Sequence, residues 1–216
     1  MNEEKDNINI KVVLVGDTGV GKTSIIDRYI NDKYDINQKT TLVSSYTFKK
    51  LYIKKYSKSV SLDIWDTAGQ ELYRALSKNF YLNASVGILV YDITRKSSFN
   101  SIKDYWYEQL KTFGEENMIF EMVGNKNDLY QKEDISEEEA RNYAKSIRAG
   151  FHLISCKENV GIKDLFEDCG KKYLETNGLT ENNDKNDKNN RKHSKNKGNI
   201  KLNKNRNKKE KKKCCG

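Results

Sequence analysis

Six apolar runs recur along the chain and predict β-strands. They are rich in branched and aromatic residues, and polar or glycine-containing stretches separate them, which is the pattern of strands that are at least half buried. The expected strands cover residues 8–15, 44–53, 59–65, 86–92, 118–124 and 151–154. We therefore expect one sheet of six strands.

Helix-forming segments alternate with these strands. The expected helices cover residues 23–31, 71–79, 98–113, 136–148 and 161–177. Ser136 is followed three residues later by Glu139, which is a capping-box signature for the start of a helix. Such an alternation is typical of parallel strands that are joined through helices.

One pair of strands departs from this alternation. Only a short polar link, residues 54–58, separates the runs 44–53 and 59–65, so these two strands are expected to form a hairpin. The predicted fold class is α/β, a three-layer sandwich of the P-loop type. It has a six-stranded, mainly parallel sheet with one antiparallel edge strand and helices on both faces. Ligands of such folds bind outside the carboxyl ends of the strands.

Charge divides the chain of 216 residues, whose formal net charge is +9, into two parts. Residues 180–213 hold fourteen Lys or Arg and four acidic residues, a net charge of +10, and the remainder carries −1. This segment has almost no apolar residues, so it cannot bury enough surface to offset chain entropy. We expect one domain over residues 1–179 and a disordered basic tail over residues 180–216.

Neither membrane spans nor metal clusters are expected. The chain has no apolar stretch of eighteen residues, and its cysteines lack the spacing of metal ligands. The four cysteines are Cys156, Cys169, Cys214 and Cys215, and we interpret them as reduced thiols of a cytosolic protein.

A phosphate-binding loop follows the first strand. Residues 16–23 read GDTGVGKT and match the pattern G-x-x-x-x-G-K-[ST] at every fixed position. Its glycines let the backbone wrap a phosphate, with N–H groups and a helix N-terminus directed at the anion. Lys22 would hold the β and γ phosphates, and Thr23 would offer a hydroxyl to Mg²⁺. The predicted nucleotide contacts of this segment are Gly16, Asp17, Thr18, Gly19, Val20, Gly21, Lys22, Thr23 and Ser24.

A second motif, which contains an aspartate, follows the third strand. Residues 65–70 read WDTAGQ and contain an Asp-x-x-Gly element. A nucleotide site needs a carboxylate for its Mg²⁺ at this position. Asp66 would reach Mg²⁺ through water, and Gly69 would let its N–H approach the γ-phosphate. A plain turn at the end of a strand is the alternative, and the phosphate loop upstream argues against it.

Two further elements predict a guanine site. Asn125, Lys126 and Asp128 follow the fifth strand, and the Asp128 carboxylate can accept from the ring N1–H and the exocyclic amine of guanine. Adenine has no such donor pair on that edge, so the element favours GTP over ATP. The aliphatic part of the Lys126 side chain would pack against the face of the base. The loop Ser155-Cys156-Lys157 would complete the pocket with the Cys156 N–H, although Cys156 could also be a small buried filler.

Together these four ordered motifs resemble the Ras-like small GTPases over residues 8–177. The resemblance implies that Tyr34 packs against the guanine edge and that Gln70 orients the attacking water. It also implies that Thr41 binds Mg²⁺ and the γ-phosphate, with Thr40 as the competing choice. The implied metal ligands are thus Thr23, Thr41 and Asp66. Hydrolysis by such a site alone is slow, about 10⁻⁴ per second for Ras, and an activating protein raises it ~10⁵-fold, which suits a switch.

Three segments are similar to those of the Rab GTPases, which regulate vesicle traffic: SLDIWDTAGQELY, GILVYDIT and EMVGNKNDL. Two further pieces, TTL and TFKKL, look most like the endosomal branch of that family. Tyr46, Trp65 and Phe80 occupy the positions of the Rab aromatic triad that effectors read in the GTP state; the alternative is that they only cover the sheet. Val43 replaces a usual glycine, and Ser44-Ser45-Tyr46 replaces a more apolar run, so the identity of the effector stays open. Leu72 replaces a common arginine without removing a nucleotide contact.

The terminal Cys214-Cys215-Gly216 resembles the double-cysteine ending that Rab proteins carry geranylgeranylated on both thiols. Two lipid chains meet the requirement for stable anchoring, and nearby lysines add attraction to an anionic leaflet. The resemblance implies a monomer on the cytoplasmic face of an endomembrane, favouring the endosome, and in the cytosol. It also implies an exchange factor, a GTPase-activating protein, a GDP dissociation inhibitor, an escort protein and effectors.

Two other functions are weighed against this switch. The basic tail could bind nucleic acid through phosphate contacts, but it has no aromatic residues for base stacking, and we expect no nucleic-acid partner. A phosphate-loop ATPase is the other alternative, and Asn125, Lys126 and Asp128 disfavour it.

Overall fold

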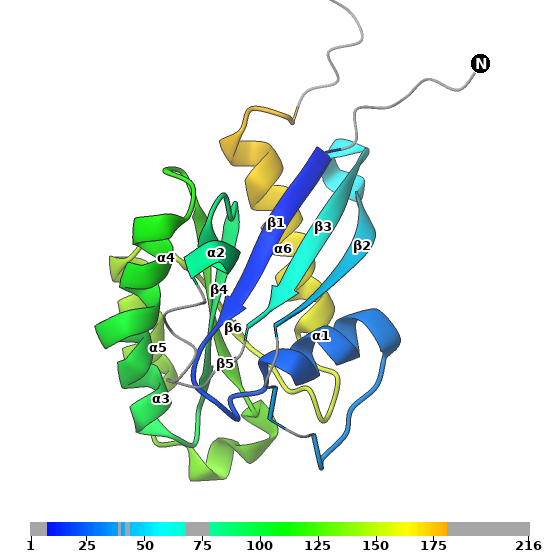
Figure 1. The fold of residues 1–216 in the computed structure, drawn as a ribbon. Helices are drawn as coiled ribbons and strands as arrows, with labels where there is room; N and C mark the ends of the chain where they lie inside the picture. The colour runs from blue at the N-terminus through cyan, green and yellow to red at the C-terminus, as the bar shows by residue number, and fades with distance from the viewer. Residues whose placement is uncertain (1–7, 39, 42–43, 68–77, 181–216) are drawn as a thin grey trace, which may run out of the picture. The chain divides into compact units, whose positions relative to one another are not determined.

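The computed structural model describes residues 8–38, 40–41, 44–67 and 78–180. Its centre is a six-stranded sheet in the order β2-β3-β1-β4-β5-β6 (Figure 1). Only the β2–β3 pair is antiparallel, and β2 is an edge strand. The strands are β1 Ile8–Val15, β2 Ser45–Ile53, β3 Lys58–Asp66, β4 Val86–Asp92, β5 Ile119–Asn125 and β6 Gly150–Leu153. The predicted fold class is confirmed.

The helices agree with the expected segments in most places. They are α1 Lys22–Asn31, α2 Lys78–Tyr81, α3 Lys96–Ser101, α4 Tyr107–Phe113, α5 Glu137–Ser146 and α6 Ile162–Thr176. The expected capping contact is present, since the Glu139 N–H donates to Ser136 Oγ at 3.1 Å. Most of the expected helix 71–79 lies outside the described residues.

Three short segments differ from the sequence prediction. The expected helix 98–113 contains a π-helical turn, Ile102–Trp106, between α3 and α4. A 3₁₀ turn, Lys54–Tyr56, closes the β2–β3 hairpin, and a second one, Asn127–Lys132, follows β5. The other expected elements are present in the described residues, with a change of helix type at Ile102–Trp106 and two additional 3₁₀ turns.

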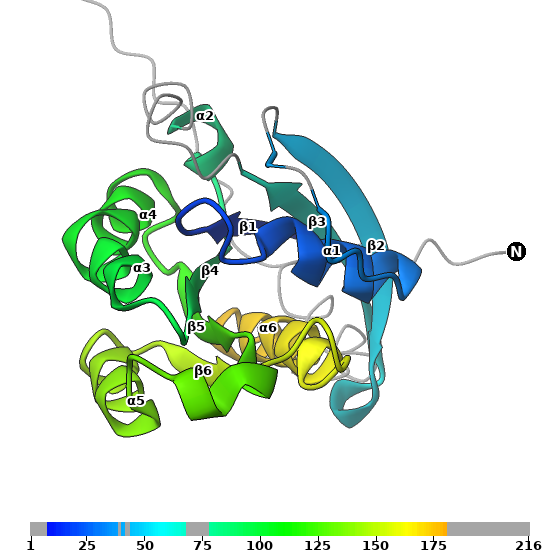
Figure 2. The ribbon, with the colours of Figure 1, turned by 90° about the horizontal axis from the view of Figure 1, so that it is seen from below.

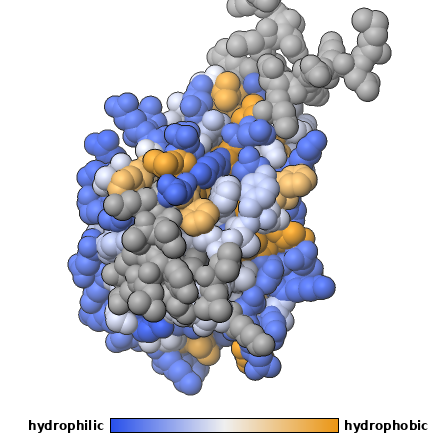
Figure 3. Space-filling model, in the orientation of Figure 1, coloured by the Kyte–Doolittle hydropathy of each residue, from blue (hydrophilic) through white to orange (hydrophobic). Residues whose placement is uncertain are grey.

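Helices cover both faces of the sheet, as Figure 2 shows. Alternate residues of β1 point to opposite faces, so Val12 packs with the residues of α1 and α6. Val13 packs with the residues of α3, α4 and α5 on the other face. The surface in Figure 3 is mainly hydrophilic, with hydrophobic side chains scattered among charged ones. Within the described ranges, none of the helices has both the length and the apolarity needed to cross a bilayer.

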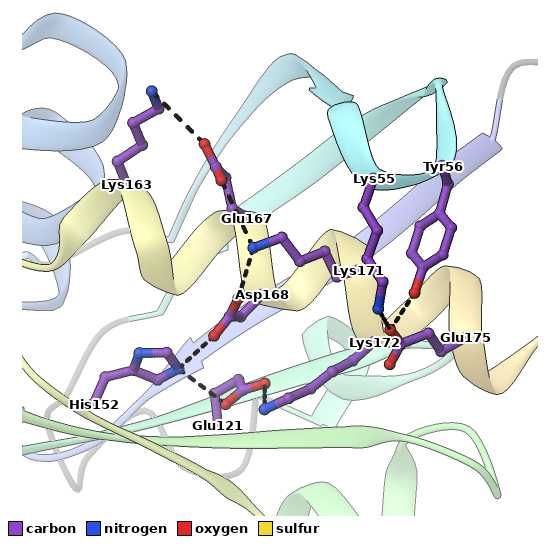
Figure 4. A network of polar contacts seen from close by, with 10 residues as sticks. All are labelled: Lys55, Tyr56, Glu121, His152, Lys163, Glu167, Asp168, Lys171, Lys172 and Glu175. Atoms are coloured by element: carbon purple, nitrogen blue, oxygen red, sulfur yellow. Dashed lines mark hydrogen bonds and ion pairs between the residues drawn. The ribbon is translucent and has the colours of Figure 1, made fainter. Parts of the chain in front are cut away.

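A network of charged side chains lies between α6 and the strands β5 and β6 (Figure 4). Glu121 is fully buried on β5, and its Oε1 accepts from Lys172 Nζ at 2.6 Å. Its Oε2 lies 3.2 Å from His152 Nε2. A Cβ atom at position 150 would lie 1.7 Å from that Oε2, so only Gly150 leaves room for the carboxylate.

We expect Lys172→Met to destabilise the domain. The change leaves Glu121 buried with His152 as its remaining neighbour in this network, and breaking a buried ion pair in this way costs about 3–5 kcal/mol. Since Lys172 is about one third exposed, we expect a loss of about 2 kcal/mol in the free energy of unfolding, measured by urea denaturation. The double variant Glu121→Met/Lys172→Met is the control. It should recover most of that loss, and a double variant as unstable as Lys172→Met would contradict the buried pair.

Candidate nucleotide-binding site

The phosphate-binding loop connects β1 to α1 and depends on two glycines with positive φ. Gly16 has φ of 146°, and a Cβ atom there would lie 2.2 Å from the Val90 carbonyl oxygen. Gly21 has φ of 101°, and its Cβ would lie 2.2 Å from Asn125 Nδ2. Any side chain at either position would push the loop away from β4 or β5. The loop therefore lies tightly against the carboxyl ends of the sheet strands.

Lys22 is a buried cation in this loop. Its side chain donates to the carbonyl oxygens of Gly16 and Asp17 at 2.7 and 3.1 Å, and the residue is 6% exposed. Burial lowers the pKa of Lys22 to about 8, while Asp66 and Asp17 act in the opposite direction. A phosphate anion beside this ammonium would compensate for its desolvation. Lys22 thus fits the predicted role of phosphate contact.

Three oxygen-bearing side chains meet beside Lys22. Thr23 Oγ1 donates to Asp66 Oδ2 at 2.6 Å and lies 2.6 Å from Thr41 Oγ1. Asp66 is 2% exposed, and its Oδ1 is buried with no hydrogen-bond partner among the described residues. Burial raises the pKa of Asp66, although the Thr23 hydrogen bond and the Lys22 charge oppose this. Hydroxyl and carboxylate oxygens are hard ligands, so this donor set fits Mg²⁺.

The base-binding loops follow β5 and β6 and are joined by hydrogen bonds. Ser155 Oγ donates to Asp128 Oδ1 at 2.7 Å, and the Asn127 N–H donates to the Ile154 carbonyl. Asn125 Nδ2 donates to the Val20 carbonyl at 2.8 Å, which ties the base loop to the phosphate loop. These contacts keep the Asp128 carboxylate in place at one end of the pocket.

Cys156 is nearly buried, and its Sγ lies 3.4 Å from Asn125 Oδ1. Burial raises the pKa of its thiol to about 12, so the group is neutral at physiological pH. The thiol therefore packs as a small side chain, and the backbone of Cys156 remains the candidate contact to a base.

One pocket contains most of the predicted nucleotide contacts. Its walls include Thr18, Gly19, Gly21, Lys22, Thr23, Ser24, Tyr34, Thr40, Thr41, Asn125, Lys126, Asp128, Cys156 and Lys157. Of the two candidate threonines, Thr41 has its hydroxyl against Thr23, and Thr40 lines the same pocket. Gly69 and Gln70 lie outside the described residues, as do Val43, Leu72 and the two C-terminal cysteines.

Of the predicted contacts that the structure describes, five are not among the residues that line this pocket: Gly16, Asp17, Val20, Asp66 and Ser155. The side chains of two of them, Asp17 and Val20, face elsewhere. The Asp17 carboxylate accepts from Trp106 Nε1 at 2.9 Å and from Ser101 Oγ at 2.8 Å, so its side chain anchors the phosphate loop to α3 and the π-helical turn. Val20 is fully buried in the core. Through their side chains, both residues support the loop from behind.

Sequence analysis missed several residues around the pocket. Asp35, Ile36, Gln38 and Leu129 line it, and Asp92 and Arg28 hold residues of its walls. Asp92, at the end of β4, lies 2.5 Å from Lys126 Nζ, which directs that side chain across the loop. Burial alone would raise the pKa of Asp92, but hydrogen bonds from Lys126 and Thr94 lower it overall. Arg28 Nε donates to the Cys156 carbonyl at 2.9 Å, and its guanidinium lies 5.8 Å from the centre of the Tyr34 ring. Arg28 belongs to none of the motifs, and Asp92 lies in the Rab-like segment GILVYDIT, which does not mark it as a partner of Lys126.

The three predicted effector aromatics are neighbours in the structure. The ring centres of Tyr46 and Trp65 are 5.2 Å apart, and those of Trp65 and Phe80 are 5.6 Å apart. Tyr46 is 52% exposed, and its hydroxyl donates to Asp63. The cluster is therefore partly open to solvent.

Comparisons with known proteins agree with this geometry. The model of the Ras family matches residues 11–175. The chain is 43% identical over 173 residues to the Ras-related protein Rab-21 of Bos taurus, covering 80% of this chain and 77% of that protein. It is 39% identical over 170 residues to Rab-21 of Geodia cydonium, covering 79% and 73% of the two chains. It is 38% identical over 168 residues to the Ras-related protein Rab-22A of Homo sapiens, covering 77% and 84%. The chain belongs to the Ras family and, within it, to the Rab small GTPases of the endosomal branch.

Proposed function

We propose that this Rab GTPase, which hydrolyses GTP to GDP, acts as a lipid-anchored switch on endosomal membranes, with Mg²⁺ as its metal ion. The observation that carries the proposal is the contact of Thr41 with Thr23, which in turn donates to Asp66. Thr41 comes from the segment before β2, and the other residues come from the phosphate site. Contact between these two regions is what allows the bound phosphates to control a surface segment.

Different residues bind the phosphates, the Mg²⁺ and the guanine base. Lys22 and the backbone N–H groups of the phosphate loop neutralise the phosphates. Thr23, Thr41 and Asp66 would hold the Mg²⁺, which supplies positive charge next to the phosphate oxygens. Asp128 accepts from the guanine ring, and its hydrogen bond from Ser155 fixes the orientation of its carboxylate. Gly69 would contribute an N–H to the γ-phosphate, and Gln70 orients the water that attacks it.

The switch acts through an exposed surface and a lipid anchor. Tyr46, Trp65 and Phe80 form the surface that effectors bind in the GTP state, and their exposed ring area suits an apolar partner. Geranylgeranyl groups on Cys214 and Cys215 hold the protein on the cytoplasmic face of the membrane. A GDP dissociation inhibitor and an escort protein bind the lipidated chain. An exchange factor and an activating protein determine whether GDP or GTP is bound. The family match gives the nucleic-acid alternative no support.

The test uses residues 1–216 with Cys214 and Cys215 intact, expressed in eukaryotic cells. We expect the parent to co-purify with guanine nucleotide and to sediment with endosomal membranes, whereas Cys214→Ser/Cys215→Ser retains nucleotide but moves to the cytosol. Lys211→Ser/Lys212→Ser, which removes tail charge but keeps both thiols, is the matched control and should stay mostly membrane-bound. Unchanged membrane association of the cysteine variant would rule out the anchor, and a parent that co-purifies with adenine nucleotide would rule out the guanine site.

A further inference from the structure

Arg95 reaches the phosphate loop from outside any nucleotide motif. It lies in the turn between β4 and α3, and its Nη2 donates to the Thr18 carbonyl oxygen at 2.8 Å. A Cβ atom at Gly19 would lie 3.9 Å from Arg95 Nη1, so the guanidinium also packs beside the next residue of the loop. The contact thus covers the Thr18–Gly19 peptide from one side.

The backbone of this turn is held firmly. The Arg95 N–H donates to the Asp92 carbonyl at 3.0 Å. The Arg95 carbonyl accepts two hydrogen bonds from Ser98, one from its N–H at 3.0 Å and one from its Oγ at 2.7 Å. Arg95 Nε is buried and makes no hydrogen bond among the described residues. A buried donor without a partner is costly. The turn therefore keeps the guanidinium on Thr18 even though one of its N–H groups is left unsatisfied.

The chemistry of a peptide group links this contact to the pocket. In a trans peptide the N–H points opposite to the C=O, so fixing the Thr18 carbonyl on Arg95 fixes the Gly19 N–H toward the other side. Thr18 and Gly19 both line the nucleotide pocket. A charged donor on the carbonyl also polarises the amide and makes its N–H a stronger donor.

We propose that Arg95 is a positioning residue for nucleotide binding: through the Thr18 carbonyl it orients and polarises the Thr18–Gly19 peptide, whose N–H binds the phosphates of the guanine nucleotide. The proposal rests on the nucleotide site proposed above. It adds that retention of the nucleotide depends on a cation from the β4–α3 turn. Arg95 is not among the residues that line the pocket, so its proposed effect reaches the phosphates through the loop.

The test measures release of a fluorescent GDP analogue from the full-length protein in excess Mg²⁺. We expect Arg95→Gln to release it about tenfold faster than the parent, because one charge-assisted hydrogen bond is lost. Arg95→Lys keeps a cationic donor and should restore the rate to within about threefold of the parent. Lys96→Gln removes the same charge one residue further on, at an exposed position, and should leave the rate unchanged. In ³¹P spectra of bound GDP, Arg95→Gln should shift the β-phosphate resonance.

Two outcomes would overturn the role of Arg95. Release from Arg95→Gln at the parent's rate would do so. Faster release from both Arg95 variants with an unmoved β-phosphate resonance, together with an equal loss of thermal stability with and without nucleotide, would show that Arg95 only stabilises the fold. A parent that binds no GDP analogue would instead overturn the nucleotide site itself, so the two failures can be told apart.

Discussion

Replacing Asp128 by asparagine is expected to lower the affinity for GDP about 10³-fold and to raise the affinity for xanthosine diphosphate. The Asp128 carboxylate can accept from both the N1–H and the exocyclic amine of guanine, whereas an amide turns one acceptor into a donor. Sites built on such hydrogen bonds reject a mismatched partner by about 10⁴–10⁵-fold at most. Xanthine carries an oxygen in place of the exocyclic amine, so it pairs with the new donor. Competition against a fluorescent guanine nucleotide measures both affinities.

The surroundings of Asp128 allow this change without loss of the fold. Its side chain is 8% exposed and accepts from Ser155 Oγ, and an asparagine can keep that bond through its amide oxygen. Asp164→Asn is the matched control, since it makes the same chemical change at an exposed position on α6. It should bind GDP like the parent. An Asp128→Asn protein that still prefers guanine to xanthine would place base recognition elsewhere in the pocket.

The strands were predictable because each is marked by its own residues. β4, Val86–Asp92, is buried at every position and stands out as an apolar run. The π-helical turn Ile102–Trp106 was not predictable, because it preserves the apolar spacing of a continuous helix. The buried charge of Glu121 was also hidden, because its partners Lys172 and His152 come from α6 and β6. Local pattern therefore predicts the elements, while pairing between distant elements requires the fold.

The same distinction applies to the site. Lys22, Asp66 and Asp128 each lie in a contiguous motif whose spacing carries the chemistry, so the sequence marks them directly. Asp92 and Arg95 lie in none of the four nucleotide motifs, and they reach Lys126 and Thr18 only because β4 lies beside β1 and β5 in the sheet. Aspartate and arginine are common on surfaces, so composition alone could not single them out.

Replacing Lys22 by methionine is expected to reduce affinity for GDP about 10³-fold with little change in the stability of the nucleotide-free domain. Losing one partner of a buried charge pair costs about 2–5 kcal/mol of binding. In the free domain the loss of two hydrogen bonds to the carbonyls of Gly16 and Asp17 is offset by removing a buried ammonium. We therefore expect the free energies of unfolding to agree within about 1 kcal/mol, measured in urea after nucleotide removal. A variant that is unfolded without nucleotide would assign Lys22 a structural role.

The pH dependence gives a second, independent measurement on the same pair of proteins. With its pKa lowered by burial to about 8, Lys22 of the free protein is half deprotonated near pH 8. The bound phosphates favour the charged form, so binding takes up a proton as the pH rises through this range, and above it the affinity of the parent falls by up to about tenfold per pH unit. Below about pH 7 both states are protonated and this group adds no pH dependence. Lys22→Met has no proton to gain, so its affinity should not show this additional fall above pH 8, and equal slopes for the two proteins would contradict a buried, phosphate-facing ammonium.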